Sequence, residues 1–446
     1  MDELKTIAEK ALRYGEKLGA EEVEVCLVKG ITREVKCEGE EVQASSKMIE
    51  EASVRTSIGT KVGISYVTDF NERSVLRAVE DAFKMARASQ GDPYWRGLPD
   101  PSRPGHRWIG YDEGLVTLET SDMISMMKEL KRWIKGRGKE LKIARAAINT
   151  SILYELIVNT RGVWAEDRGT GMYAFIYLKG KRGDRESTGF GYRAARSMIN
   201  DFEPMINDAI RLAKDGLRAE PLEGGKYSGR VVLTQEVFAS LIQSLLIPAI
   251  AADNVQEGLS PLKGKVGERI LADTFTMIDD GTKPGGIGTT LYDGEGVARG
   301  KTTIFERGVL KSFIHNTYTA RRENRSSTGN ASRRAGRVGV APSNLIINRG
   351  TKSKEELIGE LEKGILLDGM LMSVHTVNPV TGDFSVVVTN PYLIERGEVT
   401  KPLKQLTFAG NIYQSLKDYL AANDCKWASG SIFTPTVMIG EATLSS

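Results

Sequence analysis

The spacing of hydrophobic residues in the first part of the chain switches between helical and strand periods. A stripe with helical spacing is formed by Leu4, Ile7, Ala8, Ala11 and Leu12. Segments that alternate between hydrophobic and polar residues follow, among them EEVEVCLVKG and EEASVRTSIG. A second helical stripe begins after Asn71, a residue suited to capping a helix N-terminus. Residues 1–92 are therefore predicted to form a helix–antiparallel-sheet–helix unit.

The same order of elements returns further along the chain. A helical stripe that includes Met123 and Met127 leads into the strand-like segment TGMYAFIYLKG, and another helical stripe surrounds Ile210. We expect a second unit of this kind over residues 113–222, packed with the first unit as one N-terminal lobe. Residues 93–112 hold four of the 14 prolines and are predicted to be an extended linker.

Residues 226–446 have a different pattern, in which one helix at the front is followed by many short strand-like segments such as NLIINRG and DFSVVVTN. Glycine accounts for 47 of the 446 residues, above the usual share of about 7%, and this favours a turn-rich domain. The pattern predicts a mostly antiparallel β domain with a front helix. The whole chain is thus expected to have an α+β fold.

Charge and hydropathy narrow the classes of partner. The formal net charge is +3 and 27% of the residues are charged, which does not favour a nucleic-acid binder. The sequence has no run of about 18 apolar residues, so we expect no membrane span. The cysteines, Cys26, Cys37 and Cys425, are odd in number and lack CxxC spacing. This usage favours a reducing compartment, and a cytoplasmic protein is expected.

Histidines are scarce, and His106, His315 and His375 share no motif with one another or with a cysteine. The sequence therefore contains no zinc signature such as HExxH. Two acidic pairs occur, Asp279 with Asp280 and Asp293 with Glu295. Each pair is compatible with a site for a hard cation or with a tight turn, because Asp and Gly also form turns readily.

One loop is strongly basic: RRENRSSTGNASRRAGR, from Arg321 to Arg337, holds six arginines. Arginine forks and backbone N–H groups can bind a phosphate or a peptide carboxylate. A solvated basic loop, or a contact for an acidic partner, has the same composition. The residues alone leave these three interpretations open.

Several motifs of the last part follow one another in a specific order: LSPLKGKVGERI, DDGTKPGGIGTTLYDGEGV, STGNASRR, NPVTGDFSVVV and LTFAGNIY. In order and spacing they resemble the TldD/PmbA family, also called the modulator of DNA gyrase family. The resemblance implies that TldD-like members are zinc metallopeptidases with an HExxxH helix and a cysteine near the C-terminus. The matching region here, LIPAIAADNVQEG, has no histidine, and Pro248 is expected to interrupt a ligand-bearing helix. The chain therefore resembles the PmbA/TldE branch.

This resemblance implies a metal-free, non-catalytic subunit that forms a heterodimeric peptidase with a TldD-like metallopeptidase subunit. The partner would supply the zinc, and this chain, without a catalytic or metal-ligating residue of its own, would shape the cavity for peptides or unfolded proteins. A homodimer is expected when the chain is alone. The alternative is a homodimeric peptide-binding or regulatory protein, such as a DNA gyrase modulator, without hydrolysis of its own.

The family signature STGNASR also implies candidate contact residues for substrate or partner. Thr328 and Asn330 carry groups that can hydrogen-bond an extended peptide, and Gly329 permits close backbone approach. The competing interpretation of the same segment is a turn that the β domain requires. The full candidate set is Ser327, Thr328, Gly329, Asn330, Arg325, Arg333 and Asn411. Cys425 lies about where the catalytic branch has its cysteine, and we interpret it as a half-buried structural cysteine.

Overall fold

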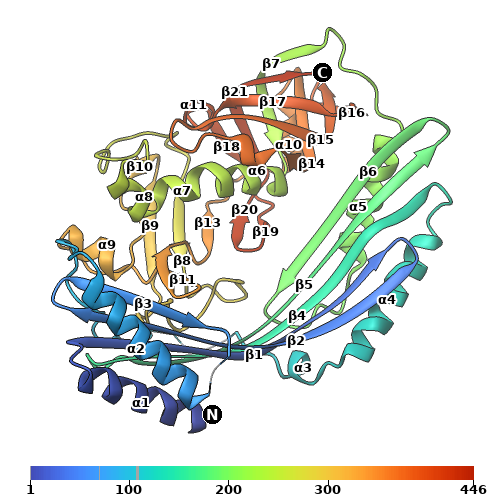
Figure 1. Cartoon of the computed structure of the whole chain (residues 1–446). Helices are drawn as coiled ribbons and strands as arrows, with labels where there is room; N and C mark the ends of the chain where they lie inside the picture. The colour runs from blue at the N-terminus through green and yellow to red at the C-terminus, as the bar shows by residue number, and fades with distance from the viewer. Residues whose placement is uncertain (1, 70, 107–109) are drawn as a thin grey trace.

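The computed structural model describes residues 2–69, 71–106 and 110–446, so positions 107–109 of the predicted linker lie outside the described residues. The N-terminal lobe is built on one six-stranded sheet with the order β3-β2-β1-β4-β5-β6 (Figure 1). Its strands are β1 (Glu22–Glu38), β2 (Glu41–Ile58), β3 (Lys61–Val67), β4 (Leu141–Asn159), β5 (Trp164–Arg182) and β6 (Arg185–Ala195). Antiparallel pairing of β1 with β4 joins the two predicted units into a single sheet.

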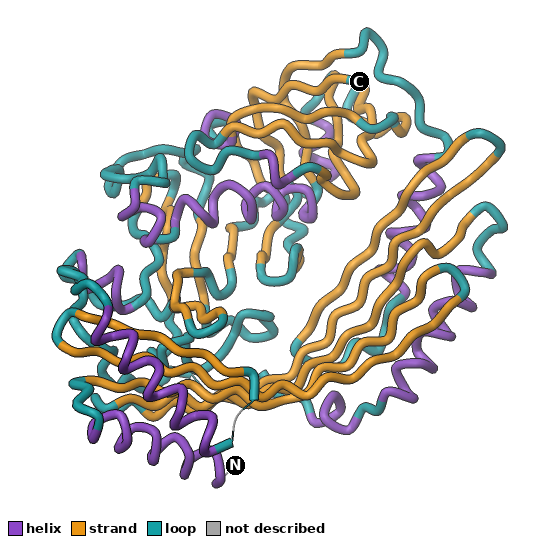
Figure 2. Tube along the Cα trace, in the orientation of Figure 1, coloured by secondary structure: helices purple, strands orange, loops and turns teal. Residues whose placement is uncertain are grey.

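All the long helices of the lobe cover one face of this sheet (Figure 2). They are α1 (Asp2–Lys17), α2 (Glu72–Ala88), α4 (Thr120–Lys135) and α5 (Glu203–Gly216), with the short α3 (Glu113–Thr117) before α4. Side chains alternate between the two faces of a strand, and the hydrophobic ones determine which face the helices cover. Val25 and Val35 of β1 are buried against the helices, whereas Glu24 points to the other face. The opposite face is turned toward the C-terminal domain (Figure 1).

The C-terminal domain contains a ring of strands and a smaller sheet. The ring runs β14-β7-β21-β17-β15 and is closed by pairing of β14 with β15. Its strands, with the attached β16 and β18, are β7 (Lys226–Leu233), β14 (Lys363–Met372), β15 (Asp383–Glu395), β16 (Glu398–Pro402), β17 (Leu406–Asn411), β18 (Tyr419–Ala421) and β21 (Val437–Ser445). Most of its pairs are antiparallel, and β14 with β7 is parallel.

The smaller sheet has the order β10-β9-β8-β13-β20-β19. Its strands, and the separate hairpin of β11 and β12, are β8 (Met277–Asp280), β9 (Lys301–Glu306), β10 (Val309–Leu310), β11 (Ala331–Arg334), β12 (Arg337–Val340), β13 (Leu345–Ile347), β19 (Lys426–Ala428) and β20 (Ile432–Thr434). The helices of the domain are α6 (Gln235–Leu241), α7 (Ile247–Ile250), α8 (Ala252–Glu257), α9 (Thr317–Arg322), α10 (Lys354–Gly359) and α11 (Ile412–Ser415). The predicted α+β class is confirmed.

The predicted front helix is α6, and it continues through a π-helical turn, Ile242–Leu246, into α7. It is apolar and lies in the core of the domain between the ring and the smaller sheet. Its buried side chains include Phe238, Leu241, Ile242, Leu245, Leu246, Ala249 and Ile250. None of the helices in the described part of the chain is long and apolar enough to cross a membrane.

Candidate functional site

The segment Ser327–Asn330 forms a turn that is bound tightly to the rest of the C-terminal domain. The Thr328 hydroxyl accepts a hydrogen bond from the His315 N–H at 2.7 Å and lies 2.7 Å from Asn330 Oδ1, to which it can donate. Ser327 Oγ donates to the His315 carbonyl at 3.2 Å. Asn330 is fully buried, and its Nδ2 donates to Asp279 Oδ2 at 2.7 Å. The polar groups of this segment thus have partners within the chain.

Gly329 completes the turn. Its φ of +72° lies in the left-handed region, and a Cβ atom there would be 2.7 Å from the Ala298 carbonyl oxygen. Only glycine fits both constraints. These contacts favour the turn interpretation of the signature; a role in binding substrate or partner stays a prediction.

Both acidic pairs are also engaged within the chain. Asp279 is 2% exposed and accepts hydrogen bonds from the Ser343 N–H at 2.7 Å and the Ser343 hydroxyl at 2.9 Å. Burial raises the pKa of this carboxyl. Asp280 accepts from the backbone and the hydroxyl of Thr282, an Asx turn. Asp293 accepts from the backbone N–H groups of Glu295 and Val297 in its own turn and of Ala331 at the start of β11.

Arg333 connects the basic loop to the N-terminal lobe. Its guanidinium donates to the Glu24 carboxylate, to Ser53 Oγ at 3.2 Å and to the Gly294 carbonyl at 2.9 Å. The Arg333 side chain is 8% exposed and that of Glu24 is fully buried. A second arginine, Arg55 on β2, donates to Glu24 at 2.8 Å. This cluster therefore places charged groups in the interface between the lobe and the C-terminal domain.

The cluster extends to Glu295, which accepts from Arg55 at 2.8 Å and from the Thr317 N–H at 2.9 Å. Burial alone would raise the pKa of Glu24, but the charges of Arg333 and Arg55 outweigh it and hold that pKa below its usual value. Sequence reasoning missed Glu24 and Arg55. The available signal was a charged residue inside each of the hydrophobic strand segments EEVEVC and ASVRTS.

The other candidate residues lie apart from this cluster. Arg325 is half-exposed, and its Nε is 3.7 Å from a carboxylate oxygen of Glu323. Asn411 accepts from two backbone N–H groups at the start of α11 and donates to Asp383 at 2.8 Å. Arg321, which opens the basic loop, donates to the carbonyls of Arg96, Gly97 and Leu98 in the linker. Arg321, Arg325 and Arg333 of the loop thus serve separate contacts.

His315, His375 and Cys425 do not form a zinc site. His315 is 1% exposed, with Nδ1 3.3 Å from Thr319 Oγ1, and burial lowers the pKa of its ring. His375 lies in an exposed single turn after β14. Cys425 is half-buried, and burial raises the pKa of its thiol, which favours the form that does not ligate metals. No group of three His, Cys, Asp or Glu side chains in the described residues is arranged to hold a metal.

Pro248 does not end the front helix. It lies two residues after the π-helical turn Ile242–Leu246, in which the i→i−4 ladder is already replaced: the Ile247 N–H donates to the Ile242 carbonyl. The helix ends at Ile250, because Ala251 is extended with a ψ of 120°. Asp253, just beyond the break, accepts from the Val340 N–H at 3.1 Å. The segment is therefore an apolar core element rather than a platform for ligands.

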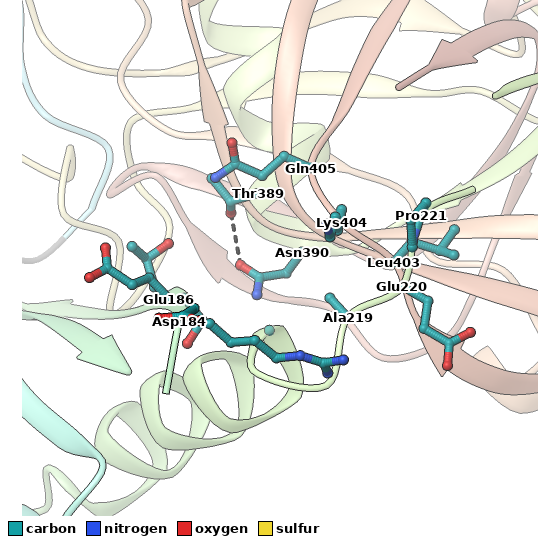
Figure 3. Close-up of a pocket in the computed structure, with 14 residues that line it drawn as sticks. Asp184, Glu186, Ala219, Glu220, Pro221, Thr389, Asn390, Leu403, Lys404 and Gln405 are labelled. Atoms are coloured by element: carbon teal, nitrogen blue, oxygen red, sulfur yellow. Dashed lines mark hydrogen bonds between the residues drawn. The ribbon is translucent and has the colours of Figure 1, made fainter. Parts of the chain in front are cut away.

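Cavities lie where β6 and α5 approach the C-terminal domain. The first has a volume of about 660 Å³ and lies between Asp184–Thr188 of the lobe and Thr389, Asn390 and Gln405 of the C-terminal domain (Figure 3). A second, of about 620 Å³, shares Glu186–Thr188 with it. Both volumes are within the range of ligand-binding pockets.

The comparisons with known proteins cover nearly the whole chain. Residues 224–446 match the PmbA/TldA metallopeptidase C-terminal domain, residues 114–217 match the central domain and residues 23–86 match domain 1 of that family. An uncharacterized protein of Methanocaldococcus jannaschii, MJ0231, is 31% identical over 96% of this chain and 98% of its own length.

Two further similar proteins have names that refer to this family or its activity. The metalloprotease MJ0996 of the same organism is 35% identical over 52% of this chain and 51% of its own length. Among solved structures, TldE from Thermococcus kodakarensis superimposes with a TM-score of 0.91 at 24% identity, covering 99% of this chain and 100% of that chain. At this identity the likeness shows the fold.

Proposed function

Because this chain belongs to the PmbA/TldA metallopeptidase family, we propose that it is the zinc-free subunit of a two-chain metallopeptidase. In this proposal a related, TldD-like subunit holds the zinc and performs hydrolysis. This chain contributes walls of the cavity in which peptides or unfolded proteins are cleaved. It works in the cytoplasm, in keeping with its three free cysteines.

The observation that supports this proposal is the lack of a set of zinc ligands among the described residues. Hydrolytic zinc requires three protein ligands and an open position for water. Among the described residues no such set converges, and the helix that would present it in a catalytic relative is filled with apolar core side chains. A chain of a metallopeptidase family without this set has a role only through another subunit or through binding. The likeness in fold to a protein named TldE supports the first of these.

Zinc content and activity together test the proposal. The chain, purified without a metal-binding tag, is expected to hold far less than one zinc per molecule by mass spectrometry of the metals. Alone it should not cleave a fluorescein-labelled unfolded protein, whereas mixing with a TldD-like subunit should give cleavage that a chelator abolishes.

The control is the same mixture with the glutamate of the partner's HExxxH motif changed to glutamine, which should remove cleavage while leaving association intact. Stoichiometric zinc in this chain, or chelator-sensitive cleavage by this chain alone, contradicts the proposal. So does a partner that is equally active with and without this chain.

A further inference from the structure

Strand β6 leaves one edge of the six-stranded sheet open. Within the described residues, β5 is the only strand hydrogen-bonded to β6. The two strands are joined by the two-residue turn Gly183-Asp184, and Arg182 is opposite Arg185. The two residues that flank such a turn, here Arg182 and Arg185, form both backbone hydrogen bonds with each other. From Arg185 onward, every second residue of β6 is hydrogen-bonded to its partner on β5 in the same way. The residues in between direct their N–H and C=O groups to the outer edge. They are Glu186, Thr188, Phe190, Tyr192 and Ala194.

This open edge lies along a groove. Two large cavities, of about 660 and 620 Å³, are lined by Asp184–Thr188 and Glu186–Thr188, and a third, of about 160 Å³, is lined by Phe190–Tyr192. The C-terminal domain forms the other wall with Thr389, Asn390 and Gln405, and further along with Thr234–Glu236. Cavities therefore lie beside β6 at Asp184–Thr188, the part that Figure 3 shows, and again at Phe190–Tyr192.

The side chains beside this edge suit apolar residues of a bound segment. Gly189 and Gly191 face α5, where a Cβ atom would lie 1.9 and 2.1 Å from backbone oxygens of that helix. Phe190 and Tyr192 consequently point to the opposite face of the sheet, each only partly buried. Their cross-strand neighbours on β5 are Tyr177 and Phe175. An aromatic surface thus accompanies the free backbone groups.

Charged residues at one end of β6 indicate the orientation of a bound peptide. The cavity at the hairpin end is lined by Lys139, Lys142, Lys179 and Lys181, against two acidic residues, Glu140 and Glu186. A strand that pairs antiparallel with β6 has its C-terminus at this end, because β6 itself begins there. Lys142 of β4 and Lys179 of β5 share the sheet face of Thr188, on the inner side of β6, and Lys181 lies 3.3 Å from Glu186. A terminal carboxylate that turns onto this face of the sheet would meet Lys179 first.

We propose that the outer edge of β6 binds an extended peptide by strand addition, antiparallel to β6, with its C-terminal carboxylate toward these lysines. Apolar side chains at alternate positions of the peptide pack on Phe190 and Tyr192, and the backbone supplies most of the recognition. The site rests on the proposed function, since it gives the zinc-free subunit a defined part in holding substrate. From Glu186 to Ala194 the edge spans roughly 27 Å at about 3.4 Å per residue, so about nine peptide residues fit.

The test is binding of a fluorescein-labelled nonapeptide, with alternating phenylalanine and serine and a free C-terminal carboxylate, to the full chain by fluorescence anisotropy. Thr188→Pro removes one outward N–H and no bond to β5, so we expect at least tenfold weaker binding. Thr188→Ala, which keeps the N–H, should stay within twofold of the unmodified chain. Val62→Pro makes the same change at an outward position of β3, the opposite edge, and should also stay within twofold.

A change in the peptide tests the direction without altering the protein. Amidation of its C-terminus should weaken binding several-fold. Lys179→Glu should weaken binding of the peptide with a free carboxylate and leave binding of the amidated peptide nearly unchanged. Equal affinities of Thr188→Pro and the unmodified chain overturn the proposal, as does failure of the unmodified chain to bind the peptide. If the Thr188→Pro variant does not fold, the affinities of the unmodified chain for the carboxylate and amidated peptides still test the proposal: equal affinities overturn it.

Sedimentation velocity distinguishes the other strand that could occupy this edge. If Thr188→Pro abolishes association with a second subunit but leaves peptide binding unchanged, the edge is a subunit contact and the proposal is wrong. The zinc content of the same preparation reports on the proposed function separately, since peptide binding to β6 requires neither zinc nor a partner.

Discussion

The substitution Arg333→Met tests whether the buried charges between the lobe and the C-terminal domain stabilise the fold. In the folded chain Glu24 and Glu295 are both buried, and Arg333 and Arg55 neutralise them. Without Arg333, a single guanidinium remains for two buried carboxylates. Removing one partner from a buried pair typically costs about 3–5 kcal/mol, because the other charge stays desolvated and unpaired. We expect a loss of this size in the free energy of unfolding.

Urea unfolding followed by tryptophan fluorescence and by circular dichroism measures this loss, provided that the two signals coincide. The matched control is Arg325→Met in the same loop. Arg325 is half-exposed and lies 3.7 Å from Glu323, so its replacement should change stability by no more than about 0.5 kcal/mol. Adding Glu24→Gln to Arg333→Met should recover at least about 1 kcal/mol, because the unpaired charge is then gone.

The pH dependence provides an independent check. The two arginines hold the pKa of Glu24 below 4.5 in the folded chain. A carboxyl with a lowered folded-state pKa contributes stability above its unfolded value and loses it as the pH falls through the folded value. The difference between the unmodified chain and Arg333→Met should therefore narrow below pH 4.5. A cost under about 1 kcal/mol, or equal costs for the Arg333 and Arg325 variants, would refute the reasoning.

Two further predictions concern single buried positions. His315 is buried and its pKa is lowered from 6.5. Below pH 6.5 the unfolded chain therefore binds a proton that the folded ring does not, and the free energy of unfolding should fall as the pH drops. His315→Gln should reduce this dependence on pH, measured as the urea midpoint at a series of pH values below 6.5. Gly189→Ala would put a Cβ atom 1.9 Å from the Ala209 carbonyl oxygen and should cost at least about 1–3 kcal/mol in thermal unfolding, whereas Gly359→Ala, in α10 with no atom within 4 Å of the new Cβ, should not destabilise.

Local patterns predicted the lobe well because its elements follow from neighbouring residues. The helical stripe after Asn71 is α2, and Asn71 accepts a hydrogen bond from the Ser74 N–H in a capping box. Its apolar positions, such as Val75 and Ala82, are buried. Such signals lie within a few residues of one another in the sequence.

Long-range pairings could not be predicted in the same way. The bond from Arg333 to Glu24 joins residues 309 positions apart, and no spacing in the sequence connects a basic loop to an acidic residue in the first strand. Pro248 was expected to interrupt the i→i−4 ladder of the front helix, and this ladder is interrupted beside it: the π-helical turn Ile242–Leu246 precedes the proline, and the helix ends at Ile250. The form of this interruption, a π-helical turn within a continuous helix, has no signal in the spacing of the residues.

The groove along β6 depends on how firmly the lobe is held to the C-terminal domain, and polar contacts hold it from two sides. Near β1 the contact is the charged cluster around Arg333. Beside β6, Arg211 of α5 donates to Asp368 at 3.0 Å, and Asn390 donates to the Leu212 carbonyl at 3.0 Å. Directional bonds fix the separation of two bodies more closely than apolar contact does, because their strength falls steeply with distance and angle. The free edge of β6 is therefore kept at a set distance from the opposite wall, as a site for strand addition requires.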